Sequence, residues 1–258
     1  MRLRRLRMRL RVCRRRAVAV RVDLSPQGLL DQQASWLAPA RARLLRRVAI
    51  ARRRCALDLG AGYGAVTGEL VRRCGGPVIA LDCALGALRE EAAAGAWPAG
   101  GDARRLPFAD GIFDLVFCQC ALLWMAPAAA AIGEIWRVLQ AGGALVALEP
   151  DYGGMLEHPP AIATRDLWLA ALTRAGADPY IGRQLPQLLS ARGFQVRVDL
   201  LPELLPPEPA RFDLLRGLPL NAQEHNALRL IQEEDRALSG EAGRVAHLPF
   251  FLVTATKL

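Results

Sequence analysis

Cys-Ala-Leu-Asp-Leu-Gly-Ala-Gly-Tyr-Gly, residues 55–64, is the stretch that decides the fold. A short apolar run ends at Asp58-Leu59, glycines follow at every second position from 60 to 64, and residues 65–74 have a helical pattern. Glycine adopts positive φ readily and has no side chain, so a turn of this kind bends sharply and lets the backbone touch a ligand. The stretch therefore predicts a strand, a ligand-binding turn and a helix.

A second carboxylate follows at the spacing that nucleoside-binding α/β proteins use. Residues 78–82 form a predicted buried strand ending in Asp82, which lies 18 residues after Gly64. An acid at the end of the second strand, about 20 residues past the glycine turn, accepts hydrogen bonds from ribose hydroxyls. Asp82 can also cap the helix predicted over residues 84–94, and one carboxylate could serve both ends.

Three further runs occur in a fixed order along the chain. They are Gly101-Asp102-Ala103 with Leu106-Pro107-Phe108, the strand over residues 113–118, and Glu134-x-x-Arg137-Val138-Leu139-x-x-Gly142-Gly143 before a strand over 144–148. Together with the acidic-x-Gly-x-Gly-x-Gly pattern that starts at Asp58, they resemble the class I S-adenosylmethionine-dependent methyltransferases, in particular the type 11 or UbiE-like domain. The matching motifs cover roughly residues 55–150, and the two ends of the chain match only in general architecture.

Seven candidate strands alternate with helices through the first five, which predicts a parallel sheet with helices on both faces. The resemblance implies a Rossmann-like class I methyltransferase fold of the α/β class, with the last strand antiparallel beside the sixth. It also implies S-adenosyl-L-methionine as co-substrate, no metal, and Asp102 near the adenine amino group. The candidate cofactor-binding residues are Asp58, Gly60, Ala61, Gly62, Gly64, Asp82, Cys83, Asp102, Ala103, Cys118 and Gln119.

Two other functions stay open from the sequence. Gly60, Gly62 and Ala65 also satisfy the Gly-x-Gly-x-x-Ala variant of a dinucleotide fingerprint, so an NAD(P)-dependent oxidoreductase is one alternative. It explains the turn and Asp82 but not the run that begins at Gly101. The second alternative is a non-catalytic S-adenosylmethionine-binding protein that has kept the fold.

A methyltransferase would act here by in-line transfer, because the sulfonium donor carries its own activation and the protein mainly positions the reactants. If the acceptor must lose a proton, the candidates for a base are His158, Tyr152 and Glu149, in a polar segment beyond the fifth strand. The other two histidines, His225 and His247, are expected to be surface or packing residues.

The end of the fourth strand argues against a nucleic-acid base as acceptor. Enzymes that methylate exocyclic amines of bases usually carry Asp/Asn-Pro-Pro-Tyr/Phe there, whereas this chain has Cys118-Gln119-Cys120-Ala121. The apolar run over residues 122–125 indicates a small, partly apolar acceptor. We expect a cytoplasmic monomer or homodimer without a membrane span.

Composition and the remaining pattern set the predicted domain organisation. The net charge of +9 comes from residues 1–16, which hold nine arginines and no acid, so the rest of the chain is neutral. The six cysteines have no metal-ligand spacing and read as reduced thiols. We predict a disordered basic arm over 1–22, cap helices over 23–52, and a methyltransferase domain over 53–258 with a helical cap insertion at about 202–246. Further helices are predicted over 162–175, 184–191, 210–218 and 222–238, and strands over 194–201 and 250–256.

Overall fold

The computed structural model describes residues 27–84, 86, 95–201, 209–238 and 243–258. They form a sheet of seven strands in the order β3-β2-β1-β4-β5-β9-β7. The strands are β1 Ala56–Leu59, β2 Val78–Asp82, β3 Ala96–Gly100, β4 Phe113–Gln119, β5 Leu139–Pro150, β7 Phe194–Leu200 and β9 Phe250–Lys257. Six are parallel, and only β9, the last along the chain, runs antiparallel to its neighbours β5 and β7. The predicted fold class is therefore confirmed.

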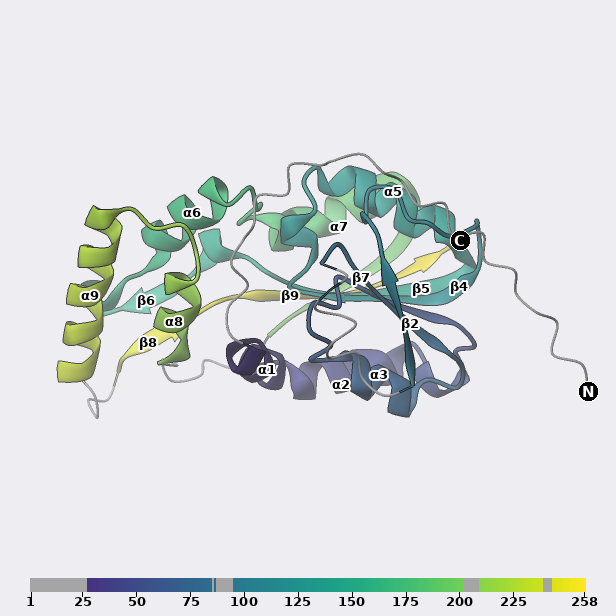
Figure 1. Ribbon diagram of the computed structural model, residues 1–258, viewed down its shortest axis with the longest axis horizontal. Helices are drawn as coiled ribbons and strands as arrows, with labels where there is room; N and C mark the ends of the chain where they lie inside the picture. Colours follow the sequence, from purple (N-terminus) through teal and green to yellow (C-terminus); the bar gives the residue numbers. More distant parts are fainter. Residues whose placement is uncertain (1–26, 85, 87–94, 202–208, 239–242) are drawn as a thin grey trace, which may run out of the picture.

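Helices cover both faces of this sheet, as Figure 1 shows. The α-helices are α1 Gln27–Trp36, α2 Ala38–Arg47, α3 Thr67–Arg73, α5 Ala128–Val138, α6 Arg165–Arg174, α7 Ile181–Arg192, α8 Ala210–Arg216 and α9 Ala222–Ala237. Short 3-10 helices occupy Ile50–Arg52, Leu122–Trp124, Tyr152–Gly154 and Pro160–Ile162. The predicted arm over 1–22 and most of the helix predicted over 84–94 lie outside the described residues.

The central strands are apolar on both faces because each face meets a helical layer. Every residue of β1 is buried, and so is the second half of β5. On one face α2 and α3 pack through Leu44, Leu45 and Leu70, and on the other face α5 and α7 pack through Ile135 and Leu185. Two separate apolar cores, one per face, therefore hold the sheet.

A second, smaller assembly lies beyond one end of the sheet (Figure 1). The three-residue strands β6 Leu156–His158 and β8 Val245–His247 pair antiparallel there. Helices α6, α8 and α9 lie at the same end of the molecule in Figure 1, and α8 packs against α6, α9 and α1. The insertion that we expected to be helical thus contains α8 and α9 but also the strand β8.

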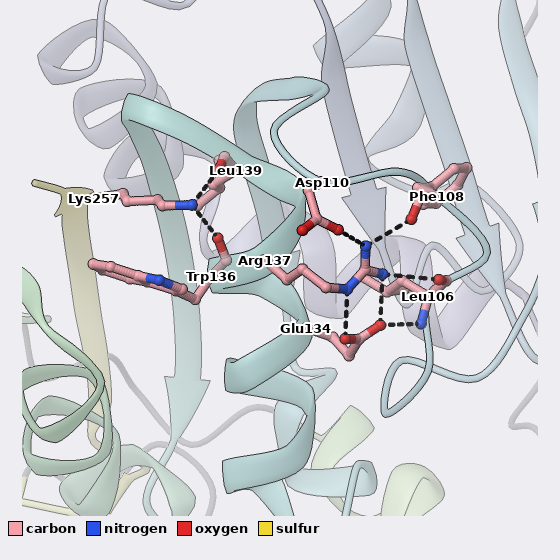
Figure 2. A network of polar contacts seen from close by, with 8 residues as sticks. All are labelled: Leu106, Phe108, Asp110, Glu134, Trp136, Arg137, Leu139 and Lys257. Carbon is pink, nitrogen blue, oxygen red and sulfur yellow. Dashed lines mark hydrogen bonds and ion pairs between the residues drawn. The ribbon is translucent and has the colours of Figure 1, made fainter.

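A network around Arg137 fixes the segment between β3 and β4 onto α5 (Figure 2). The guanidinium of Arg137 donates to both carboxylate oxygens of Glu134, to Asp110, and to the carbonyl oxygens of Leu106 and Phe108, at 2.7–3.1 Å. The Leu106 amide in turn donates to Glu134. Hydrogen bonding from Arg137 lowers the pKa of Glu134, so this carboxylate stays charged. The network anchors the chain just after Asp102 and Ala103.

Candidate cofactor and acceptor site

The glycine turn follows β1 at the carboxyl edge of the sheet, where α/β proteins bind ligands. Gly60, Gly62 and Gly64 all adopt positive φ, at 76°, 54° and 87°. The amides of Gly60 and Ala61 donate to the Leu81 carbonyl oxygen at 2.8 and 3.1 Å, which pins the turn onto the end of β2. The turn lies beside the point between β1 and β4 at which the strand order reverses.

Two of these glycines have different surroundings. A Cβ atom at position 60 would lie 2.6 Å from the Ala121 Cβ and 3.2 Å from the Met125 Cε, so Gly60 is needed for close packing. A Cβ atom at position 62 would have no heavy atom within 4 Å. Gly62 therefore presents bare backbone to open space, as a ligand-binding turn must.

Asp82 is fixed by the turn that it faces. Its Oδ2 accepts from the Gly62 amide and its Oδ1 from the Ala84 amide, both at 2.9 Å. The second bond is of the kind that a capping carboxylate makes, but most of the helix that we predicted Asp82 to cap lies outside the described residues. A carboxylate has about four acceptor positions, so each oxygen of Asp82 retains capacity for a further donor such as a ribose hydroxyl.

Asp58 is 3% exposed, and its Oδ2 accepts from the Thr67 hydroxyl at 2.7 Å. Burial raises the pKa of Asp58 to about 6, against the hydrogen bond from Thr67, and the charge of Asp82 adds to the rise. Asp58 thus braces the turn against the start of α3 and presents almost no surface to a ligand.

Asp102 and Ala103 follow β3 at the same edge as Asp82. Asp102 is exposed, and its carboxylate accepts several hydrogen bonds from Arg104, which lower its pKa. Arg104 also donates to the Ala126 carbonyl oxygen at 3.0 Å. The pKa of the Cys83 thiol is raised mainly by partial burial, then by the charge of Asp82 and, to a smaller extent, by that of Asp102. Asp82, Cys83 and Asp102 therefore face a common region.

The end of β4 brings in a residue that the sequence analysis missed. Cys118 is fully buried within the sheet, whereas the Gln119 Oε1 accepts a hydrogen bond from Arg41 at 3.0 Å. Arg41, on α2, is 5% exposed and also donates to the Ala34 carbonyl oxygen and to Glu69. It ties α1 to the carboxyl edge. Among 34 basic residues, nothing in the sequence pattern singles it out.

Glu149, at the end of β5, organises the turn after β4. Its Oε1 accepts from the amides of Ala121 and Leu122 at 3.1 and 3.0 Å, directly after Cys120, which adopts a left-handed φ of 52°. Glu149 is fully buried, and this burial raises its pKa to about 7, against the two amide hydrogen bonds. Its position is that of a buried support rather than a group in contact with an acceptor.

Tyr152 lies beyond β5 and lines an apolar cavity of about 100 Å³. Its ring stacks on Trp168 at 4.8 Å between centroids, and the side chain is 5% exposed. Burial raises the pKa of Tyr152 far above its usual value, so the phenol stays neutral. The cavity is lined by Gln33, Trp36, Leu37, Tyr152, Met155, Trp168, Leu201, Arg211, Leu214, Ala246, His247, Leu248 and Phe250.

His158 and His247 lie in different surroundings, whereas His225 is an exposed residue of α9, as expected. His158, the first candidate for a base, is an exposed residue of β6 and is not among the residues that line the cavity. His247, which we expected to be a surface or packing residue, lines the cavity from β8. Burial lowers the pKa of His247, so its imidazole is neutral at physiological pH.

The glycine turn and the cavity lie along one edge of the sheet. β1 and β5 are separated by β4, so the ends of these strands are about 10 Å apart. Within the described residues, no group of three or more histidine, cysteine or acidic side chains is arranged to hold a metal ion. No helix in that part of the chain is long and apolar enough to cross a membrane.

Comparisons with known proteins agree with this geometry. Residues 57–147 match a family model described as a methyltransferase domain. The chain is 38% identical over 133 residues to the demethylmenaquinone methyltransferase of Mycolicibacterium paratuberculosis; the match covers 51% of this chain but only 56% of that relative.

Solved structures share the fold at lower identity. A methyltransferase structure from Bacillus halodurans aligns with a TM-score of 0.58 at 18% identity, over 84% of this chain and 97% of the other. A structure described as a sarcosine dimethylglycine methyltransferase from Galdieria sulphuraria aligns with a TM-score of 0.53 at 18% identity, over 92% of both chains. Residues 57–147 therefore resemble a methyltransferase domain, and the chain shares the fold of solved methyltransferase structures.

Proposed function

We propose that this protein transfers a methyl group from S-adenosylmethionine to a small, partly apolar acceptor. The proposal is carried by the bare Gly62 backbone, Asp82 and Asp102 at one carboxyl edge, with an apolar cavity farther along the same edge. The matched methyltransferase domain supports it. No comparison favours the nicotinamide-dependent or the non-catalytic alternative.

Each residue has a definite part in this proposal. Asp82, held by the Gly62 and Ala84 amides, accepts the ribose hydroxyls without having to move. Asp102 and the Ala103 amide form the wall at the adenine end, which the Arg137 network holds in place. The sulfonium supplies the activated methyl group, so the chain mainly orients donor and acceptor and excludes water.

We propose His247 as the proton acceptor when the methyl-accepting atom must lose a proton. A base has to be unprotonated and near the acceptor, and His247 is a neutral imidazole that lines the cavity. Tyr152 keeps its proton and serves as a hydrogen-bond donor, while Glu149 supports the turn after β4.

Titration calorimetry with S-adenosylhomocysteine and NADH tests the donor assignment. We expect S-adenosylhomocysteine to bind and NADH not to bind. Asp82→Asn should weaken binding by about 1–3 kcal/mol, because ribose hydroxyls lose a charged partner. The control Asp166→Asn changes an exposed carboxylate on α6 and should leave the affinity unchanged. Tight NADH binding, or full affinity in Asp82→Asn, would overturn the assignment.

A further inference from the structure

Arg211, on α8, is a buried cation that lines the apolar cavity. Its side chain is 9% exposed, and its guanidinium lies 4.7 Å from the ring centroid of Phe212. Burial lowers the pKa of Arg211, although the group remains charged at any physiological pH. A buried charge is costly unless its donors are paired, so the partners of this guanidinium decide its role.

Among the described residues, only part of the Arg211 guanidinium finds hydrogen-bond partners. Nη2 donates to the Asp235 Oδ1 at 3.1 Å, whereas the buried Nε and Nη1 have no hydrogen-bond partner. The same Asp235 oxygen also accepts from Arg244 at 2.8 Å. One carboxylate thus serves two guanidinium groups, and the hydrogen-bonded cluster has one positive charge in excess.

Glu157 is the other acid whose charge acts on Arg211. Its carboxylate oxygens accept from the amide and hydroxyl of Thr164 and from the Arg165 amide, at 2.7–2.9 Å. Glu157 therefore fixes the start of α6 and moderates the charge at a distance. It does not satisfy the two free donors of Arg211.

We propose that the acceptor is an apolar carboxylic acid whose carboxylate binds Arg211 while its hydrocarbon part occupies the cavity. A monoanion balances the single excess charge, and its oxygens supply the acceptors that Nε and Nη1 lack. Most of the rest of the cavity wall is made of apolar side chains such as Trp36, Leu214 and Phe250. This inference rests on the proposed function, because it identifies the substrate class of the same site.

The size of the cavity limits the part of the acceptor that it can enclose. An engineered cavity of roughly 150 Å³ holds a benzene molecule, so about 100 Å³ fits a short alkyl chain. Pentanoate and pentanamide are therefore suitable probes. They have nearly the same shape, and only one of them carries a charge.

The test measures the affinity of both probes by ligand-observed NMR titration, in the presence of saturating S-adenosylhomocysteine. We expect wild type to bind pentanoate at least tenfold more tightly than pentanamide. Arg211→Gln should abolish that preference and Arg211→Lys, which keeps the charge, should retain part of it. Arg216→Gln changes an exposed arginine on the same helix and should behave like wild type.

Asp235→Asn provides a readout that does not depend on losing Arg211. Removing the negative charge leaves the cluster more positive, so the affinity for pentanoate should rise, whereas a purely structural role of Arg211 predicts no rise. Equal binding of both probes by wild type, or a preference unchanged in a folded Arg211→Gln protein, would overturn the inference. Calorimetry with S-adenosylhomocysteine separates this failure from that of the proposed function, since donor binding would then persist.

Discussion

Replacing Gly60 and Gly62 by alanine, one at a time, should separate packing from ligand binding in the glycine turn. Both residues have positive φ, so either alanine costs about 1 kcal/mol in backbone strain. At position 60 the new Cβ would also press on Ala121 at 2.6 Å. Overpacking of this kind adds roughly 1–3 kcal/mol, giving a total loss of about 2–4 kcal/mol in the free energy of unfolding.

At position 62 the strain is the whole effect on stability, because no atom lies within 4 Å of the new Cβ. The melting temperature should fall by about 2–4 °C, as 1 kcal/mol implies for a domain of this size. The affinity for S-adenosylhomocysteine should nevertheless fall at least tenfold, since the methyl group enters the space that we assign to the donor.

Gly142→Ala is the matched control for this comparison. Gly142 also has positive φ, at 72°, and open space at its Cβ position, but it lies at the opposite edge of the sheet near the start of β5. It should lose the same stability as Gly62→Ala and keep full donor affinity. Calorimetry and thermal unfolding of the three variants decide the matter. Wild-type affinity in Gly62→Ala would refute the placement of the donor over this turn.

Two further predictions concern the supports of the site. Burial raises the pKa of Glu149 from 4.5 to about 7. The protonated side chain therefore adds its full contribution to the free energy of unfolding below about pH 4.5, and this contribution is lost as the pH rises to about 7. Glu149→Gln should remove about 3 kcal/mol of this pH-dependent decrease in the free energy of unfolding. Urea unfolding of wild type and Glu149→Gln between pH 5 and 7.5 measures it, and an equal decrease in the two proteins would contradict the prediction. Asp58 titrates in the same range, which is why the two proteins must be compared. Arg137→Met should lower stability by about 2–4 kcal/mol, because Glu134 and two carbonyl oxygens lose their donor. Arg165→Met removes only an exposed ion pair and should leave the melting temperature unchanged; equal losses in both variants would refute a special role for Arg137.

Local patterns predicted the framework of the fold because each depends on neighbours in the sequence. The glycine turn, Asp82 at the end of β2, and the strands from 113 and from 250 were all found this way. β3 was not delimited, since Pro98 and the exposed Trp97 interrupt any apolar pattern. The predicted strand over 144–148 was too short, because β5 begins at Leu139 and continues through Gly142 and Gly143.

Long-range contacts determined what the sequence could not predict in the site. β6 and β8 are three residues each and pair across a long stretch of chain, so their two-stranded sheet has no local signature in the sequence. That pairing places His247 in the cavity wall and leaves His158 exposed. Arg41 and Arg211 could not be identified from the sequence for another reason. In a chain so rich in arginine, only burial distinguishes them from solvated side chains.

The position of β9 has a consequence for how the protein is synthesised. β9 lies between β5 and β7 but follows both of them in the sequence. While the chain emerges from the ribosome, neither of those strands has its final neighbour, and the backbone groups of β5 on that side stay unpaired until residues 250–257 arrive. An open strand of this kind can pair with another nascent chain. Residues 250–257 therefore close the sheet, and the open side of β5 needs protection from pairing with other chains until they have been made.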